Sequence, residues 1–250
     1  MRLFHYAGTK ALPEGPLDPQ TRSLTVENHD DQQRPIMSMT STSSRSCSFV
    51  EFEVPLVAAT RASLEGYGRL VDNYARAEIE IVTWPAPGWR PVEPGTGNEG
   101  GTTEGVFEFE WRGEVLHGRN HAVGGDYVIA WTRQPDLASE AATNPDRSRA
   151  LVRHVNYHPD GGQLFFPKAR RPFVVPLALP GDDLRPEHFV AFYCEGTEGV
   201  YIHPGVWHAA VIPLDDRAEF LDKQGKVHAR INCHIDQEFG GYLLIPLRRP

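Results

Sequence analysis

Two short segments of the chain carry side chains that can bind a metal ion or move a proton. His158 and Gln163 bracket one glycine-containing turn, and His203 and His208 bracket another. Apolar, strand-like runs flank both turns, so each segment is expected to fold as strand, tight turn and strand. Imidazole binds divalent metals and exchanges protons near neutral pH. We therefore expect the two segments to form the two halves of one small β-barrel pocket.

The spacing of these residues resembles the two metal-binding motifs of cupin barrels. In cupins a first motif, H-x-H-x(3,4)-E, and a second, P-x-G-x-x-H, supply metal ligands from neighbouring strands. The first motif here is Asn156-x-His158-x(4)-Gln163, and the second is His203-x-Gly205-x-x-His208. Asn156 stands at the place of the first cupin histidine. The spacing is kept while several ligand types change.

The changed motifs are similar to those of the ureidoglycolate lyase family. Its members carry H-P-x-G-x-Q-x-F-x-P, an apolar strand with an acidic turn, and then G-x-x-G-V-x-Y-H-x-x-x-W-H. The matching stretches are residues 158–167, 173–183, 191–192, 196–203 and 207–208, with 55–56 and 67–68 upstream. The resemblance is good over roughly residues 152–214. It implies an all-β fold, a cupin-type β-barrel (double-stranded β-helix) with an N-terminal β extension and few short helices.

The resemblance also implies an activity, the cleavage of ureidoglycolate to glyoxylate and urea in purine degradation and allantoin catabolism. It implies metal assistance by a divalent ion (nickel, manganese or zinc) held by His158, Gln163 and His208. Three neutral side chains of these types suit a mid-to-late first-row ion and leave positions open for a substrate. The reaction is a retro-addition, in which the hydroxyl loses a proton, a carbonyl forms and the C–N bond breaks as urea leaves.

The reaction assigns roles to the site residues. It needs a base at the hydroxyl, an acid at the leaving nitrogen and a cation for the carboxylate of an anionic small-molecule substrate. His203 is the predicted proton shuttle, so the predicted catalytic residues are His203, His158 and His208. Lys168 or a nearby arginine would hold the carboxylate. The predicted substrate-binding residues are Lys168, Asn156 and Trp207.

Three departures from the family pattern leave the substrate open. Pro204 replaces a basic residue common in the family, and Ala209-Ala210 replaces His-Pro. The N-terminal half is longer than the compact family norm, with an insertion-like loop, rich in proline and glycine, at 85–105. A changed pocket mouth can keep the chemistry and change the molecule, so a related ureido or hydroxy acid is an alternative substrate. Two different functions also fit the motifs: a metal-dependent cupin isomerase or dioxygenase acting on a small acid or sugar, and a non-catalytic small-molecule-binding cupin. Gln163 at the carboxylate position counts against an oxygenase.

Composition restricts the partners and the compartment. The chain has 250 residues and a formal charge of -8, without the clustered Lys and Arg that a nucleic-acid partner needs. Its three cysteines form no C-x-x-C pair, which favours a reducing compartment, and no apolar run is long enough to span a bilayer. We therefore expect a cytoplasmic protein. Exposed strand edges predict a two-fold homodimer, as does the family resemblance.

The chain divides into an N-terminal arm and one domain. Residues 1–46 mix Pro, Gly, Ser and charges with too few apolar residues for a core, whereas residues 47–250 form a single elaborated cupin-like domain with its motif core at 152–214. One short helix is expected from Thr60 to Gly66 or Gly68. Strands are expected at 49–54, 77–84, 106–111, 127–131, 164–166, 173–179, 189–194, 200–203, 209–213, 227–235 and 242–246.

Overall fold

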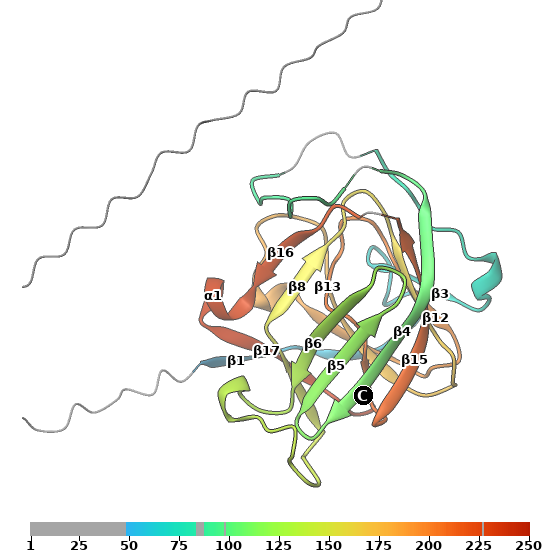
Figure 1. Cartoon of the computed structure of the whole chain (residues 1–250). Helices are drawn as coiled ribbons and strands as arrows, with labels where there is room; N and C mark the ends of the chain where they lie inside the picture. Colours follow the sequence, from blue (N-terminus) through green and yellow to red (C-terminus); the bar gives the residue numbers. More distant parts are fainter. Residues whose placement is uncertain (1–48, 84–87, 98, 227) are drawn as a thin grey trace, which may run out of the picture. The chain divides into compact units, whose positions relative to one another are not determined.

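The computed structural model describes residues 49–83, 88–97, 99–226 and 228–250, and the regular secondary structure of this part is mostly β-strand (Figure 1). It has the all-β, cupin-type architecture that the sequence predicts. The predicted arm, residues 1–46, and the start of the domain at Cys47 lie outside the described residues. In the described part, no helix is both long enough and apolar enough to cross a membrane.

The first sheet contains the long strands of the molecule. Its members are β1 (Val50–Glu53), β3 (Gly68–Val71), β4 (Thr102–Arg112), β5 (Val115–Asn120), β6 (Gly125–Trp131), β7 (Arg149–Val152), β9 (Gln163–Pro167), β12 (Gly199–Ile202), β15 (Arg217–Gly225) and β17 (Gly241–Pro246). They are ordered β1-β17-β7-β6-β5-β4-β15-β9-β12-β3. Strands far apart in sequence are therefore neighbours: β15 pairs with both β4 and β9, and Figure 1 shows it beside β4.

The second sheet carries His208 of the predicted site, and His158 follows directly after one of its strands. Its members are β2 (Leu56–Ala58), β8 (His154–Tyr157), β10 (Phe173–Ala178), β11 (Val190–Cys194), β13 (Trp207–His208) and β16 (Ile231–His234), with β14 (Ile212–Pro213) paired to β10. The order is β16-β8-β13-β10-β11-β2. The helical elements are short: η1 (Tyr74–Arg76), η2 (Pro135–Leu137), η3 (Pro186–His188) and α1 (Ile235–Phe239).

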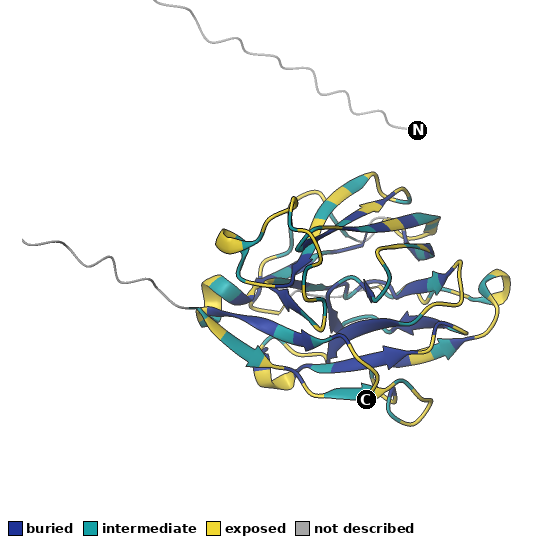
Figure 2. Cartoon of the chain, turned by 90° about the horizontal axis from the view of Figure 1, so that it is seen from below, coloured by how far each residue is buried: buried dark blue, intermediate teal, exposed yellow. Residues whose placement is uncertain are grey.

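One hydrophobic core joins the two sheets. All six residues of β10 are buried, whereas β4 buries alternate residues, Phe107, Phe109 and Trp111, as a strand with one solvated face must. The three buried residues of β4 belong to a single cluster that also contains Val155 and Trp207 of the second sheet. Figure 2 shows the buried residues concentrated in the strands and the exposed ones in the connecting loops.

Two predicted elements differ from the structure. The expected helix after Thr60 is a run of turns over residues 61–67, in which the φ of +85 at Gly66 interrupts the helical path. The expected strand at 77–84 has no ladder in its described part, residues 77–83, and makes one isolated bridge from Ile81 to Gly161. Residues 77–83 therefore lack the neighbouring strand that would complete a ladder, although Ile79 packs against the cluster of Val71, Leu164 and Tyr201.

Several strands that the sequence did not predict are present. They are β2, β3, β5, β7, β8, β13 and β15. β15 is the most informative, because its buried face carries Phe220, Asp222 and Gln224. Two polar residues on the inward face hide the alternation of apolar and polar residues that identifies a strand.

Candidate active site

A cavity of about 350 Å³ lies between the two sheets and contains four of the predicted site residues. These four are Asn156, His158, Gln163 and His208. The first sheet adds Phe107, Asn120, Tyr127, Phe165 and Gln224 to the wall, and the late segment around residue 228 adds Lys226, His228 and Arg230. The volume suits a small molecule.

Strand register explains why these residues meet. Side chains alternate along a strand, so His154, Asn156 and His158 point to one face. Asn156 pairs with His208 across β8 and β13, which places both side chains on that face. A turn at Gly161 and Gly162 then carries the chain across to the first sheet. A Cβ atom at Gly161 would lie 2.6 Å from Nε2 of His228, so only glycine permits this close approach.

His158 and His208 have their ring centroids 5.2 Å apart, and each Nδ1 is held by a backbone carbonyl. The Nδ1 atoms lie 3.1 Å from the oxygen of Ala229 for His158 and 2.8 Å from that of Val206 for His208. A carbonyl oxygen only accepts, so Nδ1 carries the hydrogen in both rings and Nε2 keeps its lone pair. Each ring is thereby prepared as a base or a metal ligand.

Both imidazoles are neutral at physiological pH. Burial lowers the pKa of His208 to about 4, against a smaller opposing effect of its hydrogen bond to Val206. Burial, reinforced by the neighbouring rings of His228 and His208, lowers the pKa of His158 well below its ordinary value. A positive charge on His158 is therefore opposed from two sides.

His228 is a third buried imidazole of the cavity. Its ring centroid lies 4.3 Å from that of His158, and its Nε2 accepts a hydrogen bond from the backbone N–H of Gly225. The hydrogen is then on Nδ1, which is buried and has no hydrogen-bond partner among the residues that the structure describes. Burial, followed by the effect of His208, lowers the pKa of His228 to about 3.

A buried carboxyl group that the sequence analysis did not single out supports the wall behind Gln163. Asp222 is 0% exposed; its Oδ1 accepts from Nε2 of Gln163 at 2.8 Å and its Oδ2 from Nδ2 of Asn120 at 3.0 Å. Burial raises the pKa of Asp222 to about 6, although both hydrogen bonds favour the ionised form. The sequence offered one signal for Asp222. It is an ionisable residue at a position of 217–225 that alternates in step with the buried Phe220, and buried Asp residues are rare unless they have partners.

The described segment 88–97 of the loop expected at 85–105 contributes to the cavity rim. Glu93 donates its backbone N–H to the oxygen of Arg230 at 2.7 Å, and its carboxylate lies 3.3 Å from the Arg230 guanidinium. Thr96 lines the cavity and accepts from the backbone N–H of Arg230 at 3.0 Å. This loop, which the sequence left without a role, holds the arginine of the cavity in place.

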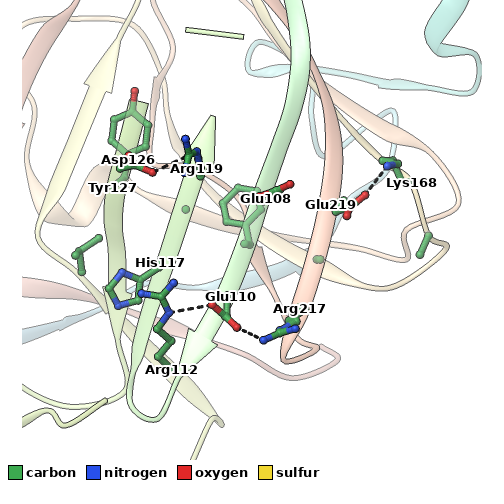
Figure 3. A pocket seen from close by; sticks show the side chains of 15 residues that line it. Glu108, Glu110, Arg112, His117, Arg119, Asp126, Tyr127, Lys168, Arg217 and Glu219 are labelled. Carbon is green, nitrogen blue, oxygen red and sulfur yellow. Dashed lines mark hydrogen bonds and ion pairs between the residues drawn. The ribbon is translucent and has the colours of Figure 1, made fainter. Parts of the chain in front are cut away.

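Lys168, predicted to bind the substrate, lies on the outer face of the first sheet. Gln163 and Phe165 line the cavity, so alternation along β9 directs Lys168 outward. Lys168 forms an ion pair with Glu219 there, at the edge of an open depression of about 980 Å³. Figure 3 shows this pair among the charged residues of β4, β5 and β15, where Arg217 also pairs with Glu110. Its position does not support the predicted role of Lys168 with the carboxylate.

His203 and Trp207 are also outside the cavity lining. His203 continues the outward face of β12, where its ring packs edge-on against Tyr201 with centroids 5.4 Å apart. Trp207 is fully buried, and its Nε1 donates to the oxygen of Gly181 at 2.7 Å. Trp207 therefore packs within the wall. The position of His203 does not support its predicted role as proton shuttle. Its ring lies on the outward face of the first sheet, whereas His208, beyond the turn at Gly205, lines the cavity.

The donor set fits a bound metal ion only in part. The free Nε2 atoms of His158 and His208 are suitable ligands, and Gln163 adds an amide group. Nε2 of His228 is already occupied by Gly225. Among the residues with described positions, no group of three His, Cys, Asp or Glu side chains is arranged to hold an ion. An ion here would depend on a neutral amide as its third protein ligand.

Comparison with known proteins identifies the family. Residues 130–238 match the family model described as ureidoglycolate lyase. A ureidoglycolate lyase of Azotobacter vinelandii is 35% identical over 148 residues, which cover 52% of this chain and 84% of that protein. The chain belongs to the ureidoglycolate lyase family. It is therefore an enzyme of the ureidoglycolate lyase type.

Other members of the family are matched over a shorter part. The ureidoglycolate lyase of Stutzerimonas stutzeri is 40% identical over 91 residues, 36% of this chain and 51% of that protein. One from Pseudomonas aeruginosa is 40% identical over 105 residues, 41% of this chain and 57% of that protein. For these two, the matched part spans little more than half of the relative. The loop at 85–105, Phe107 and Asn120 lie before the residues that match the family model.

Proposed function

We propose that the protein cleaves the C–N bond of ureidoglycolate, or of a closely related ureido acid, to glyoxylate and urea. The observation that carries this proposal is the pair of neutral imidazoles, His158 and His208, whose lone pairs on Nε2 are free in one cavity. General base catalysis needs such a lone pair within reach of the substrate hydroxyl. The family supplies the substrate class, because its members are named for ureidoglycolate.

His208 is the better base of the two. Its charged form is opposed mainly by burial, whereas that of His158 is also opposed by two neighbouring imidazoles. Nε2 of His208 takes the hydroxyl proton as the carbonyl of glyoxylate forms. The electron pair of the breaking C–N bond stays on the ureido nitrogen, and the imidazolium returns the proton to that nitrogen. Urea leaves neutral, and no further reactant is consumed.

The substrate carboxylate needs a cation, and the wall offers Arg230. Arg230 and Lys226 are the lysine and arginine side chains of the cavity lining in the described chain. Glu93 and Thr96 hold Arg230 at the rim, where it can meet a carboxylate while the hydroxyl faces His208. Asn156 lies beside His208 on the neighbouring strand and adds a hydrogen-bonding group. Arg230 thus takes the role that the sequence analysis gave to Lys168.

Metal assistance remains a prediction from the motif spacing. An ion bound by His158, Gln163 and His208 would supply Lewis-acid activation of the substrate oxygens. It would also occupy the lone pair on Nε2 of His208. The steps above use only groups of the chain.

The test is release of urea and glyoxylate from ureidoglycolate and from a panel of related ureido acids. The panel is needed because Pro204 and Ala209-Ala210 differ from the family pattern. We expect turnover of at least one ureido acid. If none is turned over with or without nickel, manganese or zinc, while the acids still raise the melting temperature, the protein is a binder and the lyase proposal fails.

A further inference from the structure

Asp222 is a buried carboxyl group that the proposed reaction does not use. It lies on β15 at the back of the cavity wall, and none of the ion pairs found among the described residues includes it. A buried carboxylate without a cation is costly, so its hydrogen bonds must serve as its compensation. Those bonds go to Gln163 and Asn120.

The direction of each hydrogen bond in this group is fixed. Asn120 accepts from the backbone N–H of Ala122 with its Oδ1 at 2.9 Å, so its Nδ2 must face Asp222. A carboxylate accepts and does not donate. Its second oxygen therefore binds Nε2 of Gln163 and leaves the amide oxygen Oε1 for the cavity that Gln163 lines.

We propose that Asp222 is a positioning residue that holds the oxygen end of the Gln163 amide toward the cavity and thereby selects a ligand carrying N–H donors. The ligand class, a ureido group, rests on the proposed function, whereas the amide orientation does not. The two ends of an amide have nearly the same shape but opposite hydrogen-bonding character. A reversed amide would set a donor against the N–H groups of the substrate, and a buried mismatch of this kind discriminates strongly.

A pair of variants separates this role from a general structural one. In Asp222→Asn, the side chain must turn its oxygen toward Asn120, whose direction Ala122 fixes. Its NH₂ group then faces Gln163, and the Gln163 amide rotates to place its own NH₂ in the cavity. In the double variant Asn120→Asp with Asp222→Asn, the carboxylate at 120 accepts from both Ala122 and the new asparagine. The oxygen of that asparagine is free for Gln163, so the original orientation returns.

The first measurement reports the amide directly and needs no activity. In protein labelled with ¹⁵N-glutamine, the side-chain signal of Gln163 is assigned by its loss in Gln163→Glu. We expect slow hydrogen exchange of this NH₂ group in the wild type, faster exchange in Asp222→Asn and slow exchange again in the double variant. Equal exchange in the wild type and the folded single variant would overturn the inference.

The second measurement concerns the substrate. For the ureido acid that the wild type turns over, we expect Asp222→Asn to raise KM about 10- to 100-fold with a smaller change in kcat. The double variant should return KM to within about 3-fold of the wild type. A folded double variant that keeps the single variant's KM would contradict the inference. If the wild type turns over no ureido acid, the proposed function fails, and the exchange measurement still decides the orientation of Gln163.

Discussion

Arg90 binds both carboxylate oxygens of Glu238, with nitrogen–oxygen distances of 2.9 and 2.7 Å, across 148 residues of the chain. Its Nε also donates to the oxygen of Asp182 at 2.9 Å, and its side chain is only 5% exposed. Arg90 thereby fastens the start of the segment 88–97 to helix α1 and to the loop after β10. The same segment continues to Glu93 and Thr96 at the cavity rim.

Arg90→Met should therefore destabilise the fold. We expect the free energy of unfolding in urea to fall by about 2–3 kcal/mol, because charged hydrogen bonds and a largely buried ion pair are lost together. Arg249→Met is the matched control. Arg249 pairs with Glu195, but their side chains are 75% and 54% exposed, so its loss should cost less than about 1 kcal/mol. Equal losses in the two variants would contradict the fastening role of Arg90.

The stability difference caused by Arg90 should also depend on pH. The hydrogen bond from Arg90 lowers the pKa of Glu238. A lowered carboxyl pKa adds stability above the pKa of the unfolded state, and this stability is lost as the pH falls through the folded value. The difference between wild type and Arg90→Met should thus shrink when unfolding is measured below about pH 4. A constant difference from pH 7 to pH 3 would contradict this.

His154→Gln should make the protein less sensitive to mild acid. Burial, with a smaller effect of His234, lowers the pKa of His154 to about 4. Between pH 6.5 and 4, His154 is protonated in the unfolded chain but not in the folded protein. The free energy of unfolding therefore falls as the pH falls through this window. We expect His154→Gln to reduce the slope of unfolding free energy against pH in that window. An unchanged slope in folded His154→Gln would contradict this prediction.

Turnover should distinguish the two histidines of the second motif. We expect His208→Asn to lose about 10²- to 10⁴-fold in kcat, the usual contribution of a positioned base. His203→Asn should retain most activity, because its ring packs against Tyr201 outside the cavity lining. Circular dichroism checks that both variants fold. Loss of activity in folded His203→Asn, with His208→Asn active, would restore the shuttle role predicted from the sequence.

Metal analysis tests the prediction from the cupin spacing. We expect a divalent ion at less than one per chain in the wild type and its loss in His208→Ala, measured by elemental analysis. Turnover that is lost with a chelator and restored by the ion would support metal assistance and remove the role of His208 as free base. Equal metal content in the wild type and His208→Ala would remove His208 from the predicted ligands.

The homodimer predicted from the strand edges is tested by light scattering. Strand β1 is at one edge of the first sheet, and its Val50 is 53% exposed. An exposed apolar edge favours pairing with a second copy. We expect the mass of two chains at micromolar concentration and weakening by Val50→Lys. A single-chain mass throughout would contradict the prediction.

The fold class and half of the site follow from the sequence alone. Strand-like runs such as 173–179 and 189–194 became β10 and β11, because alternating or continuous apolar residues between turns specify strands locally. The motif spacing brought His158, Gln163 and His208 to one cavity. Spacing succeeds there because each motif spans one short turn between two strands, β8 and β9 or β12 and β13, and a residue's face follows from counting along its strand.

The rest of the cavity depends on tertiary contacts. Asp222 reaches the site through the pairing of β15 with β9, and Arg230 through contacts of its segment with residues 92 and 93. In both cases the partners are more than 50 positions apart in the chain. The local hydrophobic pattern of a segment does not show with which distant segment it pairs. On β15, the buried polar residues Asp222 and Gln224 also hide the apolar–polar alternation by which a strand is recognised. His203 and Lys168 lie outside the cavity lining. Alternation along a strand places a side chain on one of two faces, and only the packing of the two sheets decides which face borders the cavity.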